Sequence, residues 1–241
     1  MKKHLLPHVL IISFVFLLAP SGCNISKFNL KIDKLQSEVR KNPDYAKAHY
    51  KLGNAYYNTG KFQEAIESYK QAIRINPDDA DAHSGLGLTY DKLSKNEEAI
   101  KSYKHAIRID PDYADAHNNL GNAYRKSGKY KEMIESYKQA LRLDPDNAGR
   151  YSYLAGAYCK IGERKKAVKI RKEGLKIDPY DTANIIQLGF DYCIIGDKDS
   201  AFEVYKRLKE LNNQGAAKMM LKAINGEFDF LERKKKEWKG L

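Results

Sequence analysis

The chain has 241 residues, with 43 lysines and arginines, 31 aspartates and glutamates, and only three cysteines. So few cysteines in a chain of this length exclude a disulfide-stapled scaffold. The net charge of +12 is concentrated toward the C-terminus, where 148–181 has nine basic against four acidic residues and 216–241 has seven against four. Such a region is either a solvated face or a patch for phosphate or anionic lipid.

The first 22 residues have the layout of a secretory signal peptide. Lys2 and Lys3 supply a positive start, and Val9–Ala19 is an apolar run interrupted only by Ser13. A membrane-spanning helix needs about 20 apolar residues, so this run is too short for one. We therefore predict a signal peptide over 1–22.

Cys23 directly follows Ser21 and Gly22 and resembles the cysteine of a bacterial lipoprotein signal, which receives a diacylglycerol and becomes the new N-terminus. That pattern favours Leu three residues before the cysteine, and here Pro20 holds the position. We predict lipidation at Cys23 and an exported, membrane-anchored protein of the bacterial cell envelope. Plain secretion and an uncleaved N-terminal anchor are the alternatives.

A period of 34 residues governs the chain from Ala46 onward. The sequence AKAHYKLG at 46–53 returns as ADAHSGLG at 80–87 and ADAHNNLG at 114–121. Likewise SYKQAIRINP at 68–77 returns as SYKHAIRIDP at 102–111 and SYKQALRLDP at 136–145. Copies in register indicate a stack of small helical units, because no single unit can bury its apolar face alone.

When each unit is numbered from its first residue, the first three share Leu at position 7, Gly at 8, Tyr at 11, Ala at 20, Tyr at 24, Ala at 27 and Pro at 32. Met133 at position 20 of the third unit is the one departure. This pattern resembles the tetratricopeptide repeat (TPR) family. The resemblance implies an all-α, right-handed α-solenoid of tandem helix-turn-helix units.

The domain assignment follows the period. TPR 1 to 3 occupy 46–79, 80–113 and 114–147, and two degenerate units follow at 148–181 and 182–215. Residues 26–45 are predicted as an N-terminal half-unit, and 216–241 as a C-terminal capping helix with a basic tail. Gly60 and Gly128 are expected to stop first helices in the left-handed conformation. Asp78, Asp112 and Asp146 are expected to cap the helices that follow them.

No catalytic or metal centre is predicted. His49, His83 and His117 recur at position 4, but helices packed about 8–10 Å apart cannot bring them to one ion, since zinc ligands lie about 2.0–2.1 Å from the metal. The sequence has no GxSxG, phosphate-binding glycine loop or HExxH motif. We therefore predict a non-enzyme without cofactor. Cys159 and Cys193 are expected to remain reduced thiols.

The functional surface that the resemblance implies is a concave groove, lined by first-helix positions 2, 5, 6, 9, 12 and 13, that holds an extended peptide or a partner helix. The groove residues at these positions are Lys47, Tyr50, Lys51, Asn54, Tyr57, Ser84, Leu88, Asp91, Asn118, Asn119, Asn122, Arg125, Ser152 and Tyr153.

The predicted function is thus a protein-binding scaffold at the envelope. Size, lipoprotein start and repeat count resemble the lipoproteins that escort secretins in pilus assembly and those that adapt cell-wall hydrolases. Nucleic acid is not an expected partner, because little aromatic interleaving accompanies the basic residues. The alternative is association with a membrane or polyanion through the basic C-terminal part. No oligomeric state is predicted.

Overall fold

The computed structural model describes residues 22–227, and within this range the chain forms twelve α-helices and no strand. The predicted signal peptide, apart from its last residue, and most of the predicted basic tail lie outside the described residues. The helices are α1 (Gly22–Lys41), α2 (Ala46–Asn58), α3 (Phe62–Ile75), α4 (Ala80–Lys92), α5 (Asn96–Ile109), α6 (Ala114–Lys126), α7 (Tyr130–Leu143), α8 (Ala148–Lys160), α9 (Arg164–Ile177), α10 (Thr182–Ile195), α11 (Lys198–Glu210) and α12 (Gln214–Ile224).

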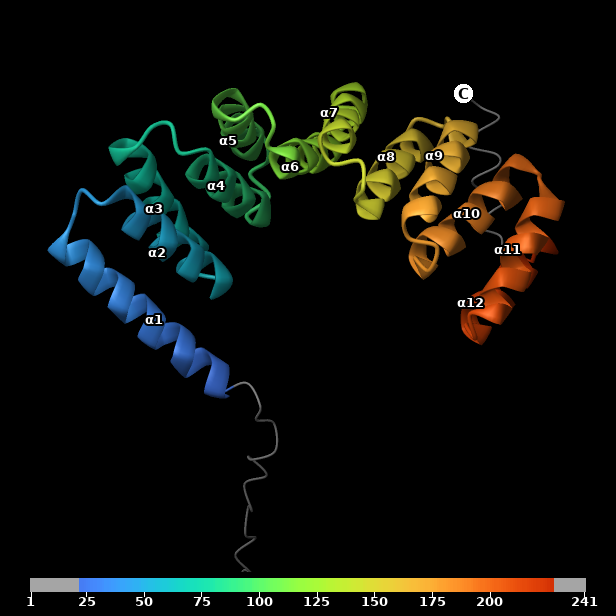
Figure 1. Ribbon diagram of the computed structural model, residues 1–241, viewed down its shortest axis with the longest axis horizontal. Helices are drawn as coiled ribbons and strands as arrows, with labels where there is room; N and C mark the ends of the chain where they lie inside the picture. The colour runs from blue at the N-terminus through green and yellow to red at the C-terminus, as the bar shows by residue number, and fades with distance from the viewer. Residues whose placement is uncertain (1–21, 228–241) are drawn as a thin grey trace, which may run out of the picture.

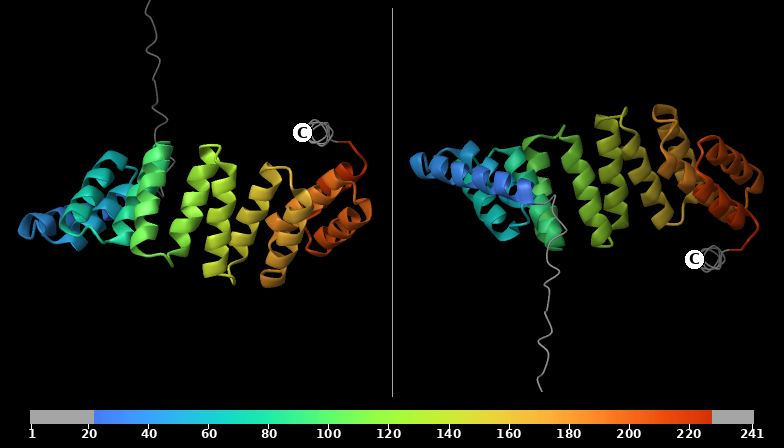
Figure 2. Two further views of the ribbon diagram at one scale, coloured as in Figure 1. Left: turned by 90° about the horizontal axis from the view of Figure 1, so that it is seen from above. Right: turned by 90° about the horizontal axis from the view of Figure 1, so that it is seen from below.

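Each predicted unit contains two helices, and each helix packs on the next along the chain. The helices form an arc, with α5 and α7 on its outer side and α1 and α12 toward its two ends (Figure 1). Seen from above and below, they stand side by side in one row (Figure 2). The first helices α2 and α4, and α4 and α6, also contact each other, which places first helices along the inner side.

The turns inside the units follow the predicted glycine chemistry. Gly60 and Gly128 have φ values of +75° and +71°, as expected for the left-handed end of a helix. In the second unit Ser94 takes this conformation, with φ of 58°. A residue with a side chain costs free energy in the left-handed conformation, so the turn at Ser94 is less favourable than the turns at Gly60 and Gly128.

The helix caps correct one prediction. The side chain of Asp79, rather than Asp78, accepts the hydrogen bond from the backbone nitrogen of Ala82. In the third unit Tyr113 occupies the cap position after Asp112, and no side-chain cap bond forms there. In the fourth unit Asn147, rather than Asp146, caps α8. The prediction placed each cap one residue too early, because the turn after the proline is one residue longer than assumed.

The core is built around one tyrosine in each of the first three units. Tyr69, Tyr103 and Tyr137 are almost completely buried. A Cβ atom added at Gly53 would lie 2.7 Å from the ring of Tyr69, and one added at Gly85 would also lie 2.7 Å from that ring. The ring is therefore held between two glycines, one from its own unit and one from the next. This explains why α2, α3 and α4 can pack so closely.

The ends of the stack are covered by helices outside the repeats. Ile32 and Leu35 of α1 are buried in the same cluster as residues of the first unit. At the other end, Ala217 and Met220 of α12 are buried against the fifth unit. No helix in the described part of the chain is long and apolar enough to cross a membrane.

Candidate functional site

The predicted groove residues all lie on the first helices α2, α4, α6 and α8. We call the surface that they form the inner surface. Their exposure differs: Lys47, Lys51, Arg125 and Tyr153 are exposed, whereas Ser84 is buried. The remaining nine are half-buried, namely Tyr50, Asn54, Tyr57, Leu88, Asp91, Asn118, Asn119, Asn122 and Ser152. Ser84 therefore belongs to the packing beneath the inner surface.

The side-chain amides of Asn54 and Asn122 on the inner surface each accept a hydrogen bond from a core tyrosine. The hydroxyl of Tyr69 donates to Oδ1 of Asn54 at 2.6 Å, and that of Tyr137 donates to Oδ1 of Asn122 at 2.8 Å. An asparagine amide also carries two N–H donors on Nδ2. The orientation of both amides is thus set by the core, with donor capacity left for a ligand. In the second unit Leu88 holds this position and offers no acceptor.

Three tyrosine rings lie on the inner surface. The ring of Tyr50 lies 6.1 Å from that of Tyr69, and the ring of Tyr57 lies edge-on to Phe62 at 5.8 Å. Tyr153 stacks on Tyr137 at 5.7 Å and keeps 47% of its area exposed. Rigid, partly exposed tyrosines lose little side-chain entropy on binding. They are suitable anchors for an extended peptide.

One ion pair forms on the inner surface, whereas Lys47, Lys51 and Arg125 remain exposed. Lys126 of α6 forms an ion pair of 2.6 Å with Asp91 of α4. Partial burial, followed by the charge of Asp91, raises the pKa of Tyr57. Lys126 was missed by the sequence analysis, although it occupies position 13 of its unit, which the family pattern assigns to the groove. The inner surface therefore presents amides and rings together with exposed positive charge.

Some polar atoms near the inner surface have no hydrogen-bond partner among the described residues. They are Oδ1 of Asn118, Oγ of Ser152 and Oδ1 of Asp91, all shielded from solvent. A buried acceptor without a partner costs free energy. Asn118 and Ser152 share position 5 of neighbouring units, so these acceptors recur along the surface at the spacing of the repeat.

The three repeated histidines have a structural role. The Nε2 atoms of His49, His83 and His117 lie 2.8, 3.1 and 3.0 Å from the carbonyl oxygens of Pro43, Pro77 and Pro111. Each histidine thus connects a first helix by a hydrogen bond to the turn that precedes this helix. Within the residues that the structure describes, no three histidine, cysteine or carboxylate side chains gather in a way that could hold a metal ion.

Comparison with known proteins supports this description. Residues 53–94, 90–127 and 121–162 match the family model described as "TPR repeat". A crystal structure of MamA is 26% identical with a TM-score of 0.61, and the match covers 68% of this chain and 97% of that one. The fold is a TPR solenoid.

A second TPR structure supports the fold alone. YrrB, described as a TPR protein with an unusual peptide-binding site, is 17% identical with a TM-score of 0.65 over 78% of this chain and 97% of its own. The structure of MamA residues 41 to the end from Desulfovibrio magneticus RS-1 is 20% identical, with a TM-score of 0.64 over 69% and 94% of the two chains. No curated protein matches the chain.

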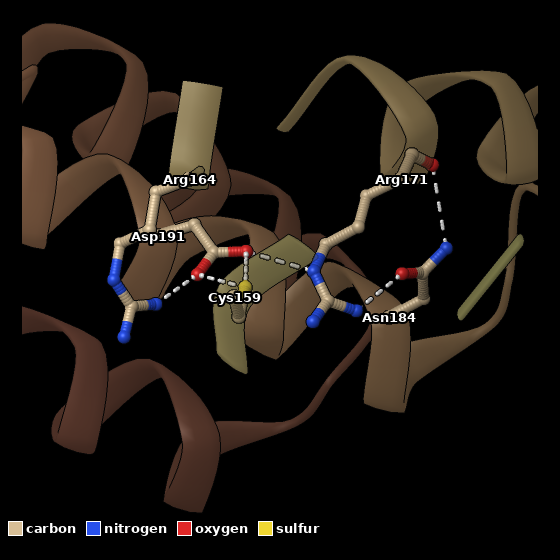
Figure 3. Close-up of polar contacts among 5 residues, drawn as sticks. All are labelled: Cys159, Arg164, Arg171, Asn184 and Asp191. Atoms are coloured by element: carbon tan, nitrogen blue, oxygen red, sulfur yellow. Dashed lines mark hydrogen bonds and ion pairs between the residues drawn. The ribbon is translucent and has the colours of Figure 1, made fainter. Parts of the chain in front are cut away.

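The junction between the fourth and fifth TPR units departs from the repeat pattern. Arg171 occupies TPR position 24, where the first three units have tyrosine, and Asp191 occupies position 10, where the other units have alanine or threonine. Nε of Arg171 lies 2.8 Å from Oδ2 of Asp191, and Nη1 of Arg164 lies 2.7 Å from Oδ1 (Figure 3). Nη1 of Arg171 also donates to Asn184.

This network serves packing rather than reactivity. Asp191 and Arg171 are 2% and 5% exposed, so a ligand cannot reach them without opening the junction. Cys159 donates to Asp191 from the other side, and burial, followed by the charge of Asp191, raises its thiol pKa to about 11. A thiol with so high a pKa is a poor nucleophile at neutral pH. Cys159 and Cys193 are not joined to each other by a disulfide.

Proposed function

We propose that this TPR protein is a non-enzymatic scaffold that binds an extended peptide or a partner helix on its inner surface. The observation that carries the proposal is the pair of amides, Asn54 and Asn122, whose carbonyl oxygens are held by core tyrosines. Preorganised donors lose little entropy when they bind a peptide backbone. Two such amides lie two units apart, which suits a ligand that runs along the solenoid.

The comparisons support protein binding as the class of function. TPR solenoids expose long surfaces rather than enclosed active sites. YrrB is described as having a peptide-binding site, and the present chain has the same fold. The half-buried tyrosines of the inner surface are the residue type that supplies the strongest contacts in protein interfaces.

Site-specific crosslinking tests the location of the binding surface. A photoreactive amino acid replaces Tyr153 on the inner surface in one variant and Lys101, an exposed residue of α5, in the other. We expect the first variant to capture a discrete partner from membrane fractions and the second to capture none. Equal capture at both positions, or capture only at Lys101, would remove the inner surface from the function.

We further propose that the scaffold works at the cell envelope, anchored by a lipid on Cys23. The support is the sequence pattern of 1–23 alone. Replacement of Cys23 by alanine should move the protein from the membrane to the soluble fraction, and labelled fatty acid should no longer be incorporated. An unchanged membrane fraction would end the lipid hypothesis without affecting the inner surface.

The alternative function is association with a membrane or polyanion through the basic C-terminal part. The second helix of the fourth unit, α9, supports it, because Lys165, Lys169 and Lys172 are exposed there. Salt distinguishes the two functions. Charge-driven association should be lost between low and high ionic strength, whereas binding through amides and rings should largely persist.

A further inference from the structure

A second candidate binding site lies between the second helices of the last two units, away from the inner surface. It is a pocket of about 410 Å³ between α9, α10 and α11. The residues that α10 contributes are Ile185, Leu188 and Tyr192, at TPR positions 4, 7 and 11. None of these positions belongs to the inner surface. The volume falls in the range of about 300–1,000 Å³ that is usual for ligand pockets.

The pocket has an apolar floor and a cationic rim. Ile185, Leu188 and Val204 are buried at its base, and half-buried Leu175 adds to it. The exposed cations Lys172 and Lys176 stand on the α9 side, and exposed Arg207 stands on the α11 side. A ligand seated on the floor would thus meet positive charge on both flanks.

The carboxylates nearby cancel only part of this charge, because neither Lys172 nor Arg207 forms an ion pair with a carboxylate of the described residues. Glu203, the one acidic residue that lines the pocket, pairs with Lys206 at 2.7 Å, and Lys176 pairs with Glu173 at 2.7 Å. Nη2 of Arg207 donates to the carbonyl oxygen of Pro179 at 2.5 Å, a contact that orients the guanidinium without neutralising it. The rim therefore keeps a net positive charge for an anionic group of a partner.

The corresponding pocket at the other end of the solenoid has different chemistry. Between α1, α2 and α3 lies a smaller pocket of about 280 Å³, with Leu52 and Tyr56 where the fifth unit has Leu188 and Tyr192. Gln36 stands in place of Lys172, and Glu64 in place of Ser200. The cations on the α9 side are common to the repeat, since the first three units have Lys at the position of Lys172 and Arg at that of Lys176, and Arg40 lines the smaller pocket. Arg207 is different, because the other four units have Gln, His or Glu at its position.

A second hollow continues the site along α11. It shares Glu203 and Arg207 with the first pocket and reaches Tyr180, which is 74% exposed. Its other lining residues are Lys206, Glu210 and Leu211, so the two cations of this hollow are balanced by two carboxylates. The combined surface is an elongated track with an exposed aromatic residue at one end. A fatty acid carries its charge at one end only, whereas this track has cations on both sides of its apolar floor. A peptide with carboxylates on both sides of an apolar side chain matches it better.

We propose that the track between α9 and α11 docks an acidic amphipathic peptide segment of a partner protein, with an aliphatic or aromatic side chain on the apolar floor and carboxylates against Lys172 and Arg207. The proposal does not depend on the inner surface. The basic residues of 228–241 make this chain's own tail a poor occupant, because like charges would meet at the rim.

The test is fluorescence anisotropy of a labelled ten-residue peptide, two leucines flanked by glutamates, titrated with the full chain. The double variant K172E/R207E should weaken binding at least tenfold. The control K218E/K222E changes the net charge equally on exposed residues of α12 and should bind within twofold of the wild type. V204S introduces the serine that the first three units have at this position, so it should fold normally and weaken binding several-fold.

Three results would overturn the proposal. The first is equal affinity of K172E/R207E and the wild type for the peptide. The second is equal affinity of the wild type for a peptide with lysines in place of the glutamates. The third is binding of phosphatidylglycerol vesicles in place of the peptide, lost in the same double variant, which would assign the cations to a lipid surface.

Discussion

The hydroxyl of Tyr69 donates a hydrogen bond of 2.6 Å to Oδ1 of Asn54 and thereby connects the core to the inner surface. Tyr69 is 1% exposed, whereas Asn54 is half-buried. The same relationship joins Tyr137 to Asn122 two units later. Replacement of either asparagine therefore changes stability as well as the binding surface, and the two effects must be measured separately.

We expect Asn54→Leu to lower the free energy of unfolding by about 1–2 kcal/mol, because the buried hydroxyl of Tyr69 loses its acceptor. Leucine is the matched choice, since Leu88 occupies the same position of the second unit. Urea denaturation of N54L, Y69F and the double variant gives the coupling energy. Strictly additive losses would show that the hydrogen bond contributes nothing to stability. Unchanged circular dichroism would show that N54L remains folded and can be used in binding assays.

A glycine that packs against a tyrosine ring should not tolerate alanine. A Cβ at Gly87 would lie 2.7 Å from the ring of Tyr103, so Gly87→Ala should destabilise the protein by about 1–3 kcal/mol through overpacking. Leucine at this position should cost more. The control is Gly156→Ala in α8, where nothing lies within 4 Å of the added atom. That variant should gain up to about 1 kcal/mol from helix propensity. Equal melting temperatures of the two variants would contradict the packing described here.

Much of the fold was predictable because the same sequence pattern recurs in several consecutive units. The 34-residue period and the tyrosine at position 24 each predict the same packing in three consecutive units, and the helices indeed begin at Ala46, Ala80 and Ala114. Cap residues were less predictable, since the choice between Asp78 and Asp79 depends on the length of the turn after Pro77. The period predicts the helices but not the residue at which this turn ends.

The contacts of the degenerate units could not be predicted from the pattern. Arg171 and Asp191 lie 20 residues apart and belong to different units, so only the packing of α9 on α10 brings them together. From the sequence, the fourth and fifth units were assigned only as degenerate repeats, and Asp191 was not recognised as the partner of Arg171. The available signal was an acidic residue at position 10, where the other units have alanine or threonine.

The buried ion pair between Arg171 and Asp191 can be tested as a replacement for the tyrosine packing of the first three units. Asp191→Ala removes the carboxylate that pairs with both Arg171 and Arg164 and should cost about 3–5 kcal/mol. The triple variant D191A/R171Y/A155G restores the small residue, the tyrosine and the glycine of the first TPR unit at these three positions, and should recover the part of the loss that comes from Arg171. Thermal unfolding followed by circular dichroism measures both. If the triple variant is as unstable as the single one, the network is not a substitute for the tyrosine packing.

The core tyrosines make stability dependent on pH in the alkaline range. Burial is the main cause that raises the pKa of Tyr137 to about 12, and it also raises the pKa values of Tyr69 and Tyr103. An unfolded tyrosine titrates near pH 10. Between about pH 10 and 12 the unfolded state therefore binds fewer protons than the folded state, so the free energy of unfolding falls as pH rises. Below pH 10 both states keep these protons, and the three tyrosines contribute no slope.

We expect urea midpoints to decrease steadily above pH 10, with tyrosinate absorbance at 295 nm appearing for the core tyrosines only as the protein unfolds. Tyr137→Phe removes one of the three buried hydroxyls and should reduce the slope. The control is Tyr180→Phe, since Tyr180 is 74% exposed and its replacement should leave the slope unchanged. Equal slopes in wild type, Y137F and Y180F would show that burial of the core hydroxyls does not control the alkaline transition, and would leave the loss of lysine charge, and of the ion pairs that depend on it, as its cause.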